Sequence, residues 1–236
     1  MGDKLKNKQD AEKSILLIFV DKYHNIAYDI IEIVKKVFMT DIENKLFMIS
    51  NLGGGIIDNK TAEKNGISRA ELSLLCKKGL IERISRGQYV LQNTVTDEIF
   101  AIGKRSENII ISHETALYLH GISDRTPFVH SLTAPSDKIP SKSLKDECKI
   151  YYIKPELFLL GKTKIKTPSG NEVNCYNLER TVCDIVRSRN KIGTETFLAA
   201  LKSYAARKDK NLNLLYEYAT KMKINGVIKK YLEVLL

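Results

Sequence analysis

The chain has 236 residues, of which 43% are hydrophobic and 28% are charged, and its formal net charge is +10. This composition is ordinary for a soluble globular protein, and the length allows two domains or one large one. The four cysteines lack the spacing of a zinc site or of a disulfide framework, and no signal peptide and no apolar run of about 18 residues is present. We therefore expect a cytoplasmic protein with reduced thiols, no metal, no cofactor and no membrane partner.

The first predicted element is a long helix over residues 11–38, which contain neither Gly nor Pro. Its main apolar stripe alternates steps of four and three residues, as the seam of a coiled coil does, through Leu16, Val20, Tyr23, Ala27, Ile30, Val34 and Val37. A second apolar row widens this stripe, so we expect the helix to pack on its own protein, with a coiled-coil dimer as the alternative.

Three shorter helices are predicted next. The first two cover residues 41–50 and 59–64, and Asp58 can N-cap the second of them. The third begins at a capping box, in which the Ser68 hydroxyl bonds the amide of Glu71 and the Glu71 side chain reaches back. A glycine follows its last turn, as is common at a helix C-terminus.

Two strands, over residues 80–84 and 88–91, are then predicted around a turn at residues 85–87. This order of elements predicts a winged helix-turn-helix over residues 40–92 and therefore DNA binding. A packing or protein-interaction module with exposed lysines is the alternative. The recognition-helix candidates, polar or cationic at exposed positions, are Ser68, Arg69, Ser73, Lys77 and Lys78. The wing candidates, placed to contact the flanking phosphates, are Arg83, Arg86 and Gln88.

The rest of the chain is predicted to mix strands and helices and to end in a helical tail. Helices are expected over residues 96–104, 113–120 (capped by Ser112), 179–188 (capped by Asn177), 194–206, 212–222 and 226–235. Strands are expected over residues 108–111, 128–133 and 149–153 and in a hairpin over residues 162–175, with a polar loop from the end of the second strand through residue 143. The predicted fold class is α+β, mostly helical, with an N-terminal helical extension (1–39), a winged helix-turn-helix domain (40–92) and a C-terminal α+β domain (93–236).

The positive charge is unevenly distributed. The net charge is +1 over residues 1–39, +2 over 40–92, −3 over 93–137 and +10 over 138–236. A basic C-terminal part favours a polyanionic partner, DNA or RNA, and a solvated lysine-rich surface is the alternative. The candidate cations are Lys162, Lys164, Lys166, Arg187 and Arg189. On a strand the three lysines would project from one face, whereas the two arginines lie where a helix C-terminus also favours cations.

Three sequence motifs together resemble the AbiEi family. They are SRGQYVL at the end of the wing, ISHETALYLHGISD in the middle of the chain and NLERTVCDIVRS near the C-terminal helices. Their order and spacing match from about residue 44 to residue 236, and the predicted helix at 11–38 departs from the family pattern. These proteins are the antitoxins of bicistronic abortive-infection (phage-defence) systems, which are type IV toxin–antitoxin systems.

The resemblance implies an N-terminal winged helix that represses the protein's own operon and a C-terminal domain responsible for antitoxicity. We expect the DNA site to be an inverted repeat in the protein's own promoter, because repressors of this kind commonly bind paired half-sites. It also implies a nucleotidyltransferase toxin that is countered without a stable protein–protein complex. An RNA- or protein-binding antitoxin module, in which the winged helix is only structural, is the alternative.

Three clusters could instead support catalysis, and we judge each to be structural. His113, Glu114 and His120 lie on one predicted helix, but the histidines are seven residues apart, and no third zinc ligand is indicated. Asp137, followed ten residues later by Glu147-Cys148-Lys149, resembles the motif of a PD-(D/E)xK nuclease, in which carboxylates hold Mg²⁺ beside a lysine. Glu179, Arg180 and Asp184 share a helix, on which Arg180 and Asp184 are spaced as an ion pair. The sequence therefore predicts a protein that is not an enzyme.

Overall fold

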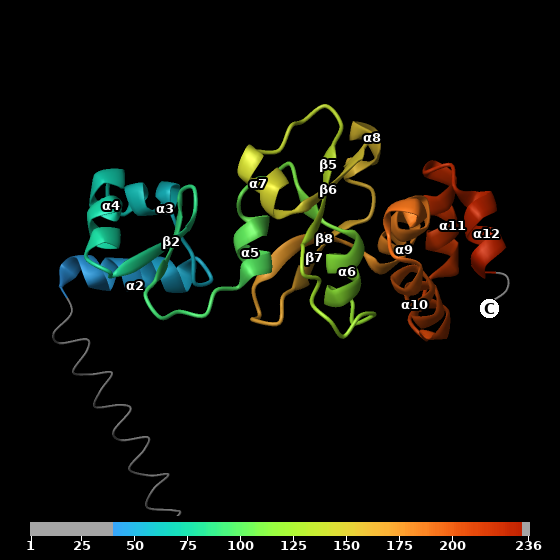
Figure 1. Cartoon of the computed structure of the whole chain (residues 1–236), viewed down its shortest axis with the longest axis horizontal. Coiled ribbons are helices and arrows are strands. Elements are labelled where there is room, and N and C mark those ends of the chain that lie inside the picture. Colours follow the sequence, from blue (N-terminus) through green and yellow to red (C-terminus); the bar gives the residue numbers. More distant parts are fainter. Residues whose placement is uncertain (1–39, 233–236) are drawn as a thin grey trace, which may run out of the picture. The chain divides into compact units, whose positions relative to one another are not determined.

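The computed structural model of the protein describes residues 40–232, so the helix predicted over residues 11–38 lies outside the described residues. The chain divides into two compact units, with the boundary between Thr94 and Val95. Both units combine helices and sheet (Figure 1), and the predicted α+β class is confirmed.

From residue 40 onward, the first unit is a winged helix built on three helices and one small sheet. Its elements are α2 (Asp41–Leu52), β1 (Ile57–Asp58), α3 (Asn59–Lys64), α4 (Arg69–Lys77), β2 (Ile81–Ser85) and β3 (Gln88–Leu91). The strands are antiparallel in the order β1-β3-β2. Leu46, Ile57, Leu72 and Ile81 are each at most 2% exposed and belong to one core that joins the helices to the sheet.

The predicted helix caps in this unit are present. Asp58 accepts a hydrogen bond from the amide of Thr61 at 2.9 Å, so it satisfies a free donor in the first turn of α3. Ser68 and Glu71 form the predicted capping box of α4, as described below. Gly79 follows α4 with a φ of +71°, a conformation that a residue without Cβ adopts easily.

The second unit is a mixed five-stranded sheet packed with helices. Its elements are α5 (Glu98–Gly103), β4 (Ile110–Ile111), α6 (His113–Leu119), β5 (Ser131–Pro135), α7 (Lys142–Glu147), β6 (Lys149–Ile153), α8 (Pro155–Phe158), β7 (Lys162–Lys166), β8 (Glu172–Tyr176), α9 (Leu178–Arg187), the 3-10 helix η1 (Arg189–Lys191), α10 (Thr194–Ala206), α11 (Leu212–Lys221) and α12 (Asn225–Leu232). The strand order is β6-β5-β4-β8-β7. The pairs β5–β6 and β4–β8 are parallel, and the pairs β4–β5 and β7–β8 are antiparallel.

The C-terminal helices form one group beside this sheet (Figure 1), with α9 packed against α6, α10 and α11. All of α9 except its last residue, Arg187, is buried. The core of the unit therefore lies around α9, where Val182 and Ile185 meet Leu201 and Leu215 from the neighbouring helices.

Two local expectations in this unit were wrong, and two short helices were not expected. The strand expected over residues 128–133 is β5 (Ser131–Pro135), because the buried run begins only at His130, whereas Phe128 is fully exposed. The short helix α7, whose first turn is capped by Ser141, begins at the end of the expected polar loop and was not predicted. The short helix α8, which starts at Pro155, was not expected at all. Ser112 makes no capping bond, because its hydroxyl instead accepts from Thr133 Oγ1 at 2.8 Å.

Candidate nucleic-acid interface

Helix α4 is fixed in place by its cap and its apolar face. The amide of Glu71 donates to Ser68 Oγ at 3.2 Å, and the amide of Ser68 donates to Glu71 Oε2 at 2.7 Å. The second bond lowers the pKa of Glu71, because the charged carboxylate is the better acceptor. Leu72 and Leu75 are buried beneath the helix. The opposite face of α4 is therefore held rigidly toward solvent.

The predicted recognition-helix side chains all lie on exposed positions. They run from the N-cap of α4 to its C-cap and are Ser68, Arg69, Ser73, Lys77 and Lys78. Ser68 is exposed, but its hydroxyl already serves the cap. Arg69 is not free either, because its Nε lies 2.7 Å from Oε1 of Glu63 on α3. Sequence reasoning missed this ion pair, since it joins two helices across a turn.

The wing presents two of its three predicted contacts. Arg83 and Arg86 are exposed, and Arg83 Nε donates to the carbonyl oxygen of Ser85 at 3.2 Å. Gln88 is only 4% exposed, and its Oε1 accepts from Ser85 Oγ at 2.8 Å. The prediction that Gln88 contacts DNA was therefore wrong: its side chain braces the base of the hairpin.

Strand β7 carries the predicted lysine row. Lys162, Lys164 and Lys166 are exposed, and the two residues between them are half-buried, so the lysines project from one face of an edge strand. Lys164 Nζ lies 3.3 Å from Oε2 of Glu172 on β8. Exposed pairs of this kind are weak, about 0–1 kcal/mol, so the row keeps most of its cationic character.

Arg187 and Arg189, which the sequence grouped with these lysines, have partners in their own unit. Arg187 Nη2 lies 3.5 Å from Oδ1 of Asp184, and its side chain is 28% exposed. Arg189 Nη1 donates to the carbonyl oxygen of Val186 at 3.2 Å, near the end of α9. Both contacts fit the alternative in which these cations stabilise the C-terminus of the helix.

The histidine cluster is a packing feature of the second unit. His113 is fully buried, with Nδ1 2.9 Å from Ser112 Oγ and Nε2 3.0 Å from Ser188 Oγ, and its ring stacks on Tyr151 at 3.4 Å. Burial lowers its pKa well below the usual 6.5. His120 Nε2 lies 2.8 Å from the carbonyl oxygen of Tyr176. The two rings therefore have separate partners.

Two of the three residues of the nuclease alternative, Glu147 and Lys149, are engaged elsewhere. Arg105 donates to both carboxylate oxygens of Glu147, and this pairing lowers the pKa of the carboxyl group. Lys149 Nζ lies 2.9 Å from Oε1 of Glu114 on α6. Within residues 40–232 no three His, Cys, Asp or Glu side chains are grouped to hold a metal ion. The geometry gives no support to a PD-(D/E)xK site.

The third cluster contains the predicted ion pair. Arg180 Nε and Asp184 Oδ2 are 3.0 Å apart, and both side chains are fully buried. Arg180 also donates through Nη1 to the carbonyl oxygens of Leu157 and Leu160, so it ties α8 and the turn that follows it to α9. Glu179 Oε1 accepts from the amide of Asn211 at 2.9 Å. All three residues serve the fold.

All four cysteines are free thiols, and burial raises the pKa of Cys148 to about 11. Among the helices of the described residues, none combines the length and the apolar character needed to cross a membrane.

The first unit belongs to the class of winged-helix proteins. It has a core of three helices and an antiparallel hairpin, with exposed cations on the last helix and at the hairpin tip. Residues 44–92 match the sequence model of a family described as "Transcriptional regulator, AbiEi antitoxin". The resemblance predicted from the sequence is thus confirmed over the winged helix.

One solved structure is similar in fold to most of the chain. It is the crystal structure of the RV2827C protein from Mycobacterium tuberculosis, which is similar with a TM-score of 0.57 and 13% sequence identity, over 79% of this chain and 75% of that chain. At this identity the similarity concerns the fold. No curated protein matches the sequence.

Proposed function

We propose that this protein is an antitoxin that also binds DNA and represses its own toxin–antitoxin operon. The observation that carries the proposal is the exposed polar face of α4 beside a wing with two exposed arginines, in the segment that matches the AbiEi family. A rigid helix with Arg69, Ser73 and Lys77 facing outward has the shape and charge to enter a major groove. Arg83 and Arg86 would then contact flanking phosphates.

The proposed partners are an inverted repeat in the protein's own promoter and a nucleotidyltransferase toxin of the same operon. The toxin would be countered without a stable complex, within a cytoplasmic phage-defence system. The lysine row of β7 is our candidate for the antitoxic surface and for additional phosphate contacts, since the winged unit alone carries a net charge of only +2. In this proposal the protein acts by binding and performs no catalysis.

A mobility-shift titration with operator and scrambled duplexes tests the DNA-binding part. The double variant Arg69→Ala/Ser73→Ala should lose most of its preference for operator, because these side chains start the recognition helix. Lys202→Ala, an exposed cation on α10, is the control. Unchanged operator preference in the double variant would reject the assigned helix.

A growth assay under toxin expression tests the antitoxin part on the same variants. If repression and antitoxicity are separate activities, the double variant should still rescue growth. Loss of both activities together would favour one shared surface. If a variant without DNA binding repressed and rescued normally, the winged helix would be only structural, as in the RNA- or protein-binding alternative.

A further inference from the structure

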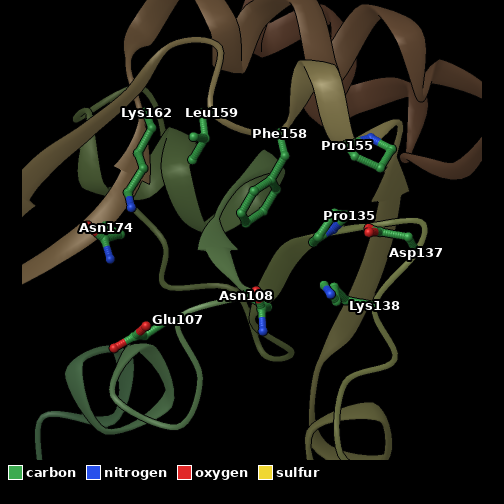
Figure 2. A pocket seen from close by; sticks show the side chains of 10 residues that line it. All are labelled: Glu107, Asn108, Pro135, Asp137, Lys138, Pro155, Phe158, Leu159, Lys162 and Asn174. Carbon is green, nitrogen blue, oxygen red and sulfur yellow. The ribbon is translucent and has the colours of Figure 1, made fainter.

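The second unit contains an open pocket of about 600 Å³ at one edge of its sheet (Figure 2). Segments that are far apart in the sequence converge there. They are the residues before β4, the end of β5 with the loop after it, α8 and its following turn, and the strands β7 and β8. The volume lies within the range of about 300–1,000 Å³ that small-molecule sites occupy.

The polar side chains around this pocket are uncommitted. Two carboxylates, two lysines and two amides line it, and none has a side-chain hydrogen bond or ion pair with another residue of the described chain: Glu107, Asn108, Asp137, Lys138, Lys162 and Asn174. By contrast, charged groups nearby are paired, as Arg105 is with Glu147 and Lys164 is with Glu172. Unpaired carboxylates, ammonium groups and amides around one pocket are suited to a ligand that itself carries hydrogen-bond donors and acceptors.

The pocket also has an apolar centre. Pro135 and the ring of Phe158 are buried, and in Figure 2 the ring projects between Lys162 and Asn174 on one side and Pro135 and Asp137 on the other. A planar ring of a ligand can pack against this centre while its polar groups reach both sides.

We propose that this pocket binds a ribonucleoside 5′-phosphate. Lys162 and Asn174 would hold the phosphate, since an ammonium and an amide N–H are both donors to an anion. Asp137 would accept from ribose hydroxyls, as acidic residues do in nucleotide sites. The carboxylates disfavour a bare polyanion such as inorganic phosphate. A sugar phosphate with an aromatic base matches the whole set, because it carries an anion, hydroxyl groups and a planar ring. The inference does not rest on the proposed DNA binding.

Calorimetric titration of the full chain tests the pocket directly. The probes are the four ribonucleoside 5′-monophosphates, the corresponding nucleosides, ribose 5-phosphate and inorganic phosphate. At least one nucleotide should bind more tightly than its nucleoside and than phosphate alone. Absence of binding by all four nucleotides at millimolar concentration, or equal binding of inorganic phosphate, would overturn the proposal.

Two variants with matched controls locate the binding. Lys162→Ala should weaken nucleotide binding about tenfold or more and leave nucleoside binding unchanged, because it removes a charged donor to the phosphate. Lys166→Ala, on the same face of β7 but outside the pocket, is its control. Asp137→Ala should weaken nucleotide and nucleoside alike, with the exposed Asp146→Ala as control. Equal effects of a variant and its control would place the ligand elsewhere.

Discussion

Arg69 and Glu63 form an ion pair, 2.7 Å from Nε to Oε1, between the first turn of α4 and the last turns of α3. Their side chains are 72% and 44% exposed, so the pair is worth about 0–1 kcal/mol and can open at little cost. In the unbound protein the pair therefore restrains the proposed base-reading arginine only weakly.

The first prediction is that Glu63→Gln strengthens operator binding. The substitution frees the guanidinium of Arg69 and removes a negative charge that would lie near the phosphates, so we expect about two- to fivefold tighter binding at low salt. A mobility-shift titration measures it. The same substitution in an Arg69→Ala background should give a smaller gain. An equal gain in both backgrounds would show that the effect is one of net charge, and the pair has no role.

The second prediction concerns the tip of the wing. Arg86→Ala should weaken binding to operator and scrambled DNA by the same factor, because a phosphate contact carries no sequence information. The slope of log K against log salt should become shallower by about one unit. Titrations at several salt concentrations measure both quantities, with Lys202→Ala as the matched cation. A loss confined to operator would instead make Arg86 a base-reading residue.

Local chemistry made much of the first unit predictable. The caps at Asp58 and Ser68 and the turn before β3 depend on residues within three or four positions of one another, so the sequence contains the full signal. Gln88 could not be placed in the same way. The β2–β3 pairing shifts register between Arg83 and Ser85, and the direction of a side chain near such an irregularity depends on the partner strand.

Convergence in space explains what the sequence did not reveal in the second unit. Arg180 and Asp184 were recognisable as a pair from their spacing, but their complete burial was not. Arg180 is enclosed by a segment about 20 residues earlier, where the carbonyl oxygens of Leu157 and Leu160 accept from its guanidinium. Glu107 and Asn174 enter one pocket from segments 67 residues apart, and no local pattern links them.

The third prediction concerns Gly161, which has a φ of +73° and lies against α9. A Cβ at this position would lie 2.6 Å from Arg180 Cβ and 3.0 Å from its Cγ. Gly161→Ala should lower the free energy of unfolding by about 2–4 kcal/mol, through backbone strain and steric overlap together. Gly170→Ala is the control, with a φ of +86° and open space, and should cost only about 1–2 kcal/mol. Urea unfolding compares them, and equal losses would mean that the contact with Arg180 is unimportant.

The fourth prediction is a pH dependence from His113. Its pKa is lowered in the folded state by burial and by nearby cations, so the unfolded chain binds the proton more readily. Stability is therefore full above the usual pKa of 6.5 and falls on acidification below it, by up to about 1.4 kcal/mol per pH unit. Asn tolerates the left-handed φ of +48° at this position, so His113→Asn should fold and lose part of this dependence. Urea unfolding at pH 5 and 7 measures the change, and identical pH slopes in variant and parent would contradict it.

The last prediction separates the two proposed roles of the protein. Reversing the charges of Lys162, Lys164 and Lys166 to Glu should weaken operator binding and flatten its salt dependence, because the row supplies cations that the winged unit lacks. The same variant should lose antitoxicity in the growth assay if the row is the antitoxic surface. The control reverses Lys142, Lys145 and Lys202, which are exposed on other elements of the same unit. If the row variant represses and rescues as well as this control does, the lysines of β7 form only a solvated surface, which protects an edge strand from pairing with other chains.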